Sequence, residues 1–157
     1  MNPFAARLKT HPDVHYRTPL GRYVWNSRFL VVATAPLIYV CIIPFALLDL
    51  AISLYQAVCF PIYGIPRVQR QEHFNFDRRK LHYLNLFEKL NCVYCSYANG
   101  LTSFVAQVAA RTEQHWCPIR NKTTSGHPYS RQAHFLPYGN AAAYRDRIER
   151  VRRDFGP

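Results

Sequence analysis

The chain is poor in acidic residues. Nine Asp and Glu stand against 20 Lys and Arg among 157 residues, which gives a formal net charge of +11 with the seven His taken as neutral. Up to Arg70 the only acids are Asp13 and Asp49. Charged residues make up 18% of the chain, which is low for a water-soluble domain, whereas a hydrophobic content of 49% excludes global disorder. The excess of positive charge leaves two classes of anionic partner open, lipid and nucleic acid.

Glycine is also scarce, with six residues in the whole chain. The sequence has no glycine-rich phosphate-binding loop, no G-x-S-x-G nucleophile elbow and no H-E-x-x-H zinc motif. Conventional enzyme classes therefore have no motif to support them. A structural or assembly role follows more easily than catalysis, although the sequence leaves the question of enzymatic activity open.

Charge is nearly absent from one long stretch. Residues 29–65 carry no charged side chain except Asp49, and the 20 uncharged residues from Phe29 to Leu48 are enough to cross a hydrocarbon core of about 30 Å as a helix. The alternative is a buried core helix of a soluble protein, but such helices are usually shorter. The 28 largely polar residues before the run argue against a cleaved signal peptide. We therefore predict that residues 29–65 form a membrane segment.

Two layouts of this segment stay open. One straight helix would be about 55 Å long, so the segment must tilt, bend or turn back, and Pro44 lies near its middle. A helical hairpin that turns near Pro44 is favoured, because it places both flanks on the cytoplasmic side. The other layout is one span over 29–48 followed by an interfacial helix over 50–65. Asp49 is expected to reach a headgroup layer or to pair with another group, because a carboxylate at the bilayer centre costs about 2.5–3.5 kcal/mol.

Basic side chains flank the apolar segment at both ends, and those closest to it are Arg22, Arg28, Arg67 and Arg70. Such residues mark the cytoplasmic face of a membrane, and each one near the surface attracts anionic headgroups by about 1 kcal/mol. We therefore expect a lipid bilayer with anionic headgroups as the main partner, and a protein partner in a membrane complex is a further option. Nucleic acid is disfavoured, because acidic residues alternate with the arginines near the C-terminus.

The predicted fold class is mainly α. Apolar residues recur at spacings of three and four from Leu81 to Tyr94 and again from Leu101 to Val108, and Asn99-Gly100 interrupts the pattern. This pattern predicts a helical hairpin after the membrane helix or hairpin. The remaining parts are a basic N-terminal arm over 1–28, the helical hairpin within 66–120, a loop over 121–139 and a basic helix over 140–157.

The C-terminal helix is predicted to be amphipathic. Asn140 is expected to act as its N-cap, and Tyr144, Ile148 and Val151 share one face at helical spacing.

Five cysteines are present, and an odd number argues against a disulfide framework. Cys41 and Cys59 lie in the apolar segment, where cysteine behaves as a small hydrophobic residue. Outside that segment, Cys92 and Cys95 follow Glu88 at helical positions i+4 and i+7, so one helix face presents all three.

A zinc or iron site follows if the predicted hairpin brings Cys117 back alongside that face. Tetrahedral metal sites need about four ligands, and Cys92, Cys95 and Cys117 supply three soft ones. Candidates for the fourth ligand are His115, Glu88 and Glu113. Inert packed cysteines are the alternative, and thiol redox chemistry is disfavoured because Cys92 is expected inside a helix and not at its N-terminus.

The segments EKLNCVYCSYANG and ARTEQHWCPI resemble those of a family of small, uncharacterised bacterial inner-membrane proteins. This resemblance implies a bacterial inner-membrane setting and adds no catalytic residue. The resulting hypothesis is a membrane-anchored helical protein with a cysteine-rich zinc or iron site on its cytoplasmic hairpin. The alternative hypothesis is a membrane interaction or assembly subunit whose cysteines are only structural.

Overall fold

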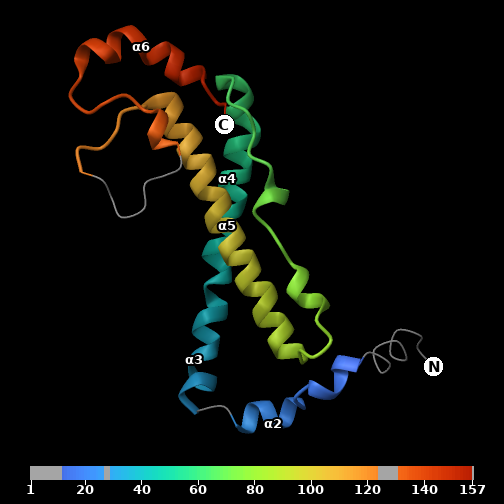
Figure 1. Cartoon of the computed structure of the whole chain (residues 1–157). Helices are drawn as coiled ribbons and strands as arrows, with labels where there is room; N and C mark the ends of the chain where they lie inside the picture. The colour runs from blue at the N-terminus through green and yellow to red at the C-terminus, as the bar shows by residue number, and fades with distance from the viewer. Residues whose placement is uncertain (1–11, 27–28, 124–130, 157) are drawn as a thin grey trace. The chain divides into compact units, whose positions relative to one another are not determined.

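The computed structural model describes residues 12–26, 29–123 and 131–156 (Figure 1). Its described part is mainly helical and contains no β-strand, so the mainly α fold class is confirmed. The α-helices are α2 (Leu20–Trp25), α3 (Phe29–Val40), α4 (Ile42–Tyr63), α5 (Leu86–Trp116) and α6 (Ala141–Arg153). The 3-10 helices are η1 (Pro12–Tyr16), η2 (Arg70–Glu72), η3 (Asp77–Lys80) and η4 (Gln132–His134). Residues 1–11 of the predicted N-terminal arm and 124–130 of the predicted loop lie outside the described residues.

The chain forms two compact units that alternate along the sequence. Unit 1 consists of Met1–Ala46 and Phe74–Gly100, and unit 2 consists of Leu47–His73 and Leu101–Pro157. Both α4 and α5 begin in unit 1 and end in unit 2.

Helices α3 and α4 follow one another with only Cys41 between them. Pro44 has no N–H and its ring crowds the carbonyl of Val40, which explains an interruption just before it. Helical bonding then resumes, because the N–H of Phe45 donates to the carbonyl of Cys41 at 3.3 Å. Proline is tolerated in the first turn of a helix, where its missing N–H would have no helical partner. The predicted hairpin turning near Pro44 is therefore wrong.

The second predicted layout required a break near Asp49, and this break is absent because α4 runs unbroken through Asp49. The end of α4 is a Schellman turn, in which the N–H of Ile65 donates to the carbonyl of Phe60 at 2.9 Å and that of Gly64 to Pro61 at 3.4 Å. This turn requires a left-handed residue, and Gly64 supplies it with a φ of 70°.

The predicted hairpin within 66–120 is wrong as well, because α5 continues through Asn99 and Gly100. The side-chain amide of Asn99 donates to the carbonyl of Cys95 at 2.8 Å and so stays along the helix. A glycine inside a helix costs about 1 kcal/mol relative to alanine. Leu101 and Phe104 follow it and are fully buried, and each such burial contributes about 1.5–3 kcal/mol. Packing therefore outweighs the local tendency to turn.

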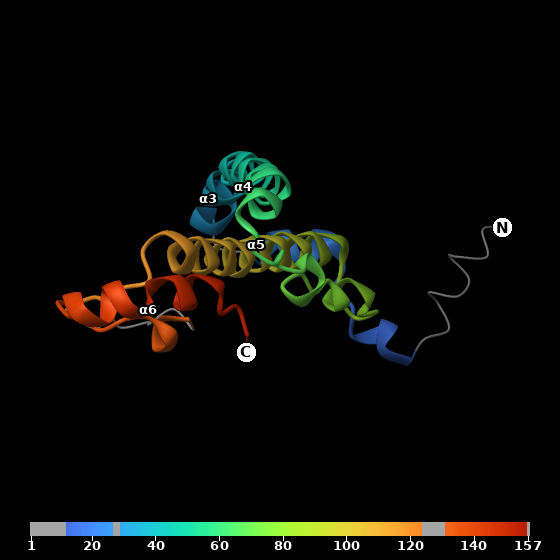
Figure 2. The ribbon, with the colours of Figure 1, turned by 90° about the horizontal axis from the view of Figure 1, so that it is seen from above.

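The core of unit 2 forms where α4 meets the second half of α5. Phe60, Leu101, Phe104 and Val108 are at most 1% exposed. The hydroxyl groups of Tyr55 and Thr112 lie 3.1 Å apart and link the two helices. Within this unit the second half of α5 lies between α4 and α6 (Figure 2).

Helix α6 confirms the predicted C-terminal helix. The side-chain oxygen of Asn140 accepts a hydrogen bond from the N–H of Ala143 at 2.9 Å, as expected of an N-cap. Ile148 and Val151 are buried, and Tyr144 packs against them. Leu136, within the predicted loop over 121–139, is 2% exposed and completes this cluster.

Unit 1 is held together by aromatic and polar contacts. The ring of Tyr94 on α5 lies 5.8 Å from that of Tyr39 and 6.5 Å from that of Phe45, measured between centroids. The hydroxyl of Tyr39 donates to the side-chain oxygen of Asn91. Among the described residues of this unit, no hydrophobic side chain is buried.

Candidate functional site

The three cysteines of the predicted metal site are not brought together by a turn of the chain. Cys92 and Cys95 lie in the first half of α5, and Cys117 follows the end of the same helix. At about 1.5 Å per residue, a straight helix places Trp116 about 36 Å along its axis from Cys92. The antiparallel arrangement that the metal hypothesis required is therefore absent from α5.

Glu88 has a structural partner at the start of α5. Its carboxylate accepts a hydrogen bond from the backbone N–H of Asn85 at 2.7 Å, and the Asn85 side chain accepts one from the N–H of Glu88 at 3.0 Å. This reciprocal pair is a capping box, which satisfies two N–H groups that the first helical turn leaves without partners. The spacing N-x-x-E was visible in the sequence and was overlooked.

The remaining two candidate ligands lie at the other end of α5. The ring of His115 stacks on that of Tyr63 with centroids 5.3 Å apart and planes 16° apart. Burial raises the pKa of Glu113 above its ordinary range, because desolvation disfavours the ionised carboxyl group.

All five cysteines are free thiols, and Cys95 and Cys117 are exposed. Within residues 12–26, 29–123 and 131–156, no group of three or more His, Cys, Asp or Glu side chains lies close enough to hold a metal ion. Zinc or iron binding stays a prediction.

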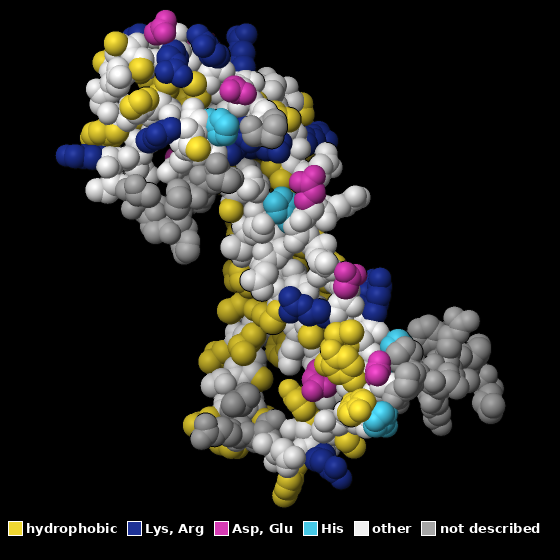
Figure 3. All heavy atoms as spheres, viewed as in Figure 1, with side chains coloured by type: hydrophobic (Ala, Val, Ile, Leu, Met, Phe, Trp, Pro, Cys, Tyr) yellow, Lys and Arg dark blue, Asp and Glu magenta, His cyan; other side chains and the backbone are white. Residues whose placement is uncertain are grey.

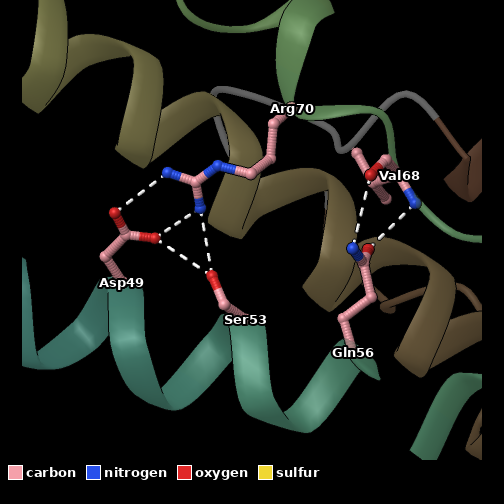
Figure 4. Close-up of polar contacts among 5 residues, drawn as sticks. All are labelled: Asp49, Ser53, Gln56, Val68 and Arg70. Carbon is pink, nitrogen blue, oxygen red and sulfur yellow. Dashed lines mark hydrogen bonds and ion pairs between the residues drawn. The ribbon is translucent and has the colours of Figure 1, made fainter. Parts of the chain in front are cut away.

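Arg70, one of the two arginines predicted to flank the membrane segment after residue 65, forms an ion pair with the one charge on the apolar helix (Figure 4). The guanidinium of Arg70 contacts both carboxylate oxygens of Asp49, at 2.5 and 3.0 Å, and donates to the hydroxyl of Ser53 at 3.0 Å. It also lies over the ring of Phe104, 5.1 Å from the centroid. The expectation that Asp49 pairs with another group is confirmed.

The other flanking arginines differ in their surroundings. Arg67 is exposed and donates to the backbone carbonyl of Ala57 at 3.1 Å. Arg22 is exposed on α2. Arg28 lies outside the described residues.

Gln56 provides a second attachment between α4 and the segment that follows it. Its side-chain amide is 8% exposed, accepts a hydrogen bond from the N–H of Val68 at 2.9 Å and donates to the carbonyl of the same residue at 3.3 Å. Asp49, Ser53 and Gln56 occupy positions i, i+4 and i+7 of α4, and therefore one face (Figure 4). This polar face was present in the sequence as a helical spacing, but only Asp49 was considered.

The rest of the apolar helix is exposed and hydrophobic. On α3, Phe29, Leu30 and Leu37 are 83%, 73% and 68% exposed, and on α4 the exposed residues include Leu50 and Ile62. Figure 3 shows hydrophobic side chains gathered along these helices, whereas Lys and Arg gather over α6. One helix of the described residues, Val32–Tyr63, is long and apolar enough to cross a membrane by length and composition.

Comparison of the chain with family models, with curated proteins and with solved structures finds no match. The resemblance to small bacterial inner-membrane proteins accordingly stays a prediction. Any function must be inferred from the geometry described above.

Proposed function

We propose that this protein is a membrane-bound helical protein with an interaction or assembly role, in which α3 and α4 contact lipid. One observation carries the proposal. The most apolar 18-residue window of Val32–Tyr63 has none of its residues buried inside the structure. A core helix of a water-soluble protein would be mostly covered, whereas a lipid-facing helix presents apolar side chains outward.

Polar side chains on this helix form hydrogen bonds within the protein, as a hydrocarbon environment requires. The hydroxyl of Thr34 donates to the carbonyl of Leu30 at 2.8 Å, and the thiol of Cys41 donates to that of Leu37 at 3.4 Å. Because hydrocarbon offers no hydrogen bonds, polar side chains in a membrane bond to their own helix or to neighbouring protein groups. The pairing of Asp49 with Arg70 follows the same rule.

The second half of α4 has one apolar side and one polar side. Leu50, Leu54 and Val58 are exposed, whereas Ser53 and Gln56 face the segment after the helix. A helix with one polar face suits the bilayer surface, where its apolar face can lie toward the acyl chains. We propose that this part of α4 lies at that depth.

The proposed setting is a bacterial inner membrane with the cysteine-bearing region on the cytoplasmic side. It is supported by the resemblance. Basic residues precede α3 and follow α4 in similar number, so the charge flanking the helix favours neither side. Anionic lipid is the proposed partner, with a protein partner in a membrane complex as the second one.

Extraction of membranes with alkaline carbonate tests lipid insertion. The full chain should stay with the membrane pellet. Leu37→Arg combined with Ile43→Arg, at exposed positions inside the apolar helix, should release it or lower its amount, because each arginine near a helix centre costs about 2.5–3.5 kcal/mol on insertion scales. The matched control is Ala109→Arg with Ala142→Arg, which adds the same charge at exposed positions of α5 and α6. Release of the wild-type chain, or equal release of both variants, would refute insertion.

The native thiols report which parts of the chain are covered by lipid. A membrane-impermeant maleimide added to open membranes should label Cys95 and Cys117, which are exposed and outside the apolar helix. Cys41 is equally exposed in the protein alone, so its protection in membranes would have to come from lipid. Labelling of Cys41 at the rate of Cys95 would argue against lipid contact at that position.

Elemental analysis of protein purified without chelator decides the zinc or iron prediction. A site built on Cys92, Cys95 and Cys117 would hold about one ion per chain and lose it in Cys92→Ser with Cys95→Ser. The test is needed because α5 does not reverse between these residues. One ion per chain, lost in that double variant, would support the metal hypothesis, and wild-type protein without an ion would refute it.

A further inference from the structure

We propose that unit 2 carries a binding site for the phosphate group of an anionic phospholipid, at the place where α4 ends. This proposal rests on the lipid contact proposed above and names a specific ligand for it. The site is a hollow of about 670 Å³. It is lined by the C-terminal ends of α4 and α5, by α6 and by Phe155, which follows α6. Tyr63, His115, Trp116, Arg152 and Arg153 are the lining residues that carry the argument.

One wall of the hollow is aromatic. Tyr63 stacks on His115, and the indole of Trp116 meets both rings edge-on, with centroids 5.4 Å from Tyr63 and 5.2 Å from His115. Trp116 is nevertheless 55% exposed. Trp and Tyr with one apolar and one polar end concentrate at the headgroup level of membranes, so this wall suits the bilayer surface.

The hollow also has a basic lining. Arg152 donates to Glu149 at 2.8 Å, but its Nε atom is buried and has no hydrogen-bond partner. Arg153 is exposed, and no ion pair of it is found among the described residues. Two arginines and one carboxylate line the same hollow, which leaves an excess of one positive charge. Guanidinium groups bind phosphate oxygens through charge-assisted hydrogen bonds.

Helix C-termini repel anions, and this effect is reduced at α6 because its last carbonyls already have donors. The buried side-chain amide of Gln114 donates to the carbonyl of Val151 at 2.8 Å, and the N–H of Asp154 donates to that of Arg150 at 3.1 Å. The partial negative charge of the helix end is therefore offset before a ligand binds.

A lipid is favoured over a free phosphate compound because the hollow continues onto the apolar face of α4. Ile62 lines the hollow and is 73% exposed. Val58, Leu54 and Leu50 precede it at intervals of four residues, so they share its face, and each is more than half exposed. A phosphate held by Arg152 and Arg153 would leave the acyl chains free to lie along this stripe.

Titration of short-chain lipids into the detergent-solubilised full chain tests the site. Trp25→Phe leaves Trp116 as the only tryptophan, and its fluorescence reports occupancy of the hollow. Dioctanoyl-phosphatidylglycerol should saturate the signal at a concentration at least about tenfold lower than dioctanoylglycerol, which has the acyl chains without phosphate, and than inorganic phosphate. Equal affinity for dioctanoylglycerol, or saturation by inorganic phosphate at the same concentration as the lipid, would overturn the assignment.

Charge-matched variants locate the binding. Arg152→Gln with Arg153→Gln should weaken phosphatidylglycerol binding at least about tenfold, whereas Arg145→Gln with Arg147→Gln, at exposed positions of the same helix, should change it less than about threefold. Arg153→Gln alone serves if the first pair unfolds the protein. Equal losses in both pairs would indicate unspecific charge attraction and overturn the site.

The two proposals fail in different ways. A chain that stays in carbonate-washed membranes but shows no preference for phosphatidylglycerol overturns the site and leaves lipid insertion standing. A chain that leaves those membranes overturns lipid insertion, and the site with it.

Discussion

Unit 1 and unit 2 differ in how they bury their hydrophobic residues. Every buried hydrophobic side chain among the described residues belongs to unit 2, including the fully buried Phe60, Leu101 and Phe104. Unit 1 contains about as many aromatic and aliphatic residues as unit 2. Nevertheless, Phe29, Leu30 and Leu86 of unit 1 are each at least 60% exposed. Unit 2 therefore has a core in addition to the exposed apolar side chains of α4, whereas the described part of unit 1 has no buried hydrophobic side chain.

This difference explains why α4 and α5 are each shared between the units. Their parts in unit 2 contribute buried residues such as Phe60 and Leu101, and their parts in unit 1 carry exposed apolar side chains such as Ile43 and Leu90. Apolar surface costs free energy in water because the adjacent water loses orientational freedom, whereas contact with acyl chains carries no such cost. The comparison teaches that unit 2 is stabilised by a packed core, which the described part of unit 1 lacks.

The largest expected effect follows from the core of unit 2. Phe104→Ala should lower the free energy of unfolding by about 3–5 kcal/mol, since it removes a fully buried ring and leaves a cavity. Phe87→Ala in unit 1 removes the same atoms from a ring that is 41% exposed and should cost less than about 1 kcal/mol. Denaturant unfolding in detergent measures both. Similar losses in the free energy of unfolding would show that packing around Phe87 stabilises the protein as much as packing around Phe104 does.

A smaller effect is expected at the ion pair on α4. Arg70→Gln leaves the carboxylate of Asp49, which is 17% exposed, without its guanidinium partner and should cost about 1–2 kcal/mol after allowance for solvent screening at Arg70. Asp49→Asn in the same chain should recover part of this loss, and a double-mutant cycle measures the coupling. Arg67→Gln, which removes the same charge beside a carbonyl, is the control. A coupling near zero would contradict the role of the pair.

The capping box tests whether unit 1 is held by local bonds. Asn85→Ala removes the side-chain acceptor for the N–H of Glu88 and should cost about 1 kcal/mol. The loss should be local, so amide hydrogen exchange should accelerate at the start of α5 and stay unchanged at Phe104. Asn121→Ala, at an exposed position beyond the helix, is the control. Equal acceleration throughout α5 would mean that the two halves of this helix unfold together.

The smallest effect concerns pH. Because burial raises the pKa of Glu113 above its ordinary value of 4.5, the folded state binds this proton more tightly than the unfolded state. Stability is therefore highest below the ordinary pKa and declines as pH rises through the raised one. Glu113→Gln should remove this decline and raise the melting temperature slightly at neutral pH. Thermal unfolding across pH 4 to 8 measures it, with Glu72→Gln at an exposed position as control.

Several features of the fold were predictable because they depend on local chemistry. The uncharged run after residue 28 predicted a long apolar helix, and the helical spacing of Tyr144, Ile148 and Val151 predicted the buried face of α6. Asn140 was identified as an N-cap from its residue type and position. The capping box at Asn85 and Glu88 was equally predictable and was missed because Glu88 was considered only as a metal ligand.

Both predicted hairpins were wrong for a common reason. Pro44 and Gly100 are residues that often end helices, but each lies where a helix can tolerate it. Pro44 falls in the first turn of α4, and Gly100 directly precedes the buried Leu101. The partner of Asp49 was also beyond prediction in detail, because Arg70 is separated from it by 21 positions and a turn of the chain.

Composition and periodicity were sufficient for the helical class, the apolar helix and the amphipathic α6, because side-chain polarity and helical spacing act over a few residues. The scarcity of acids had a consequence that only the tertiary structure decided. Asp49, one of two acids before Arg70, forms an ion pair with that arginine. The direction of the chain at Gly100 was likewise decided by burial, because the core that Leu101 and Phe104 complete involves residues far away in the sequence.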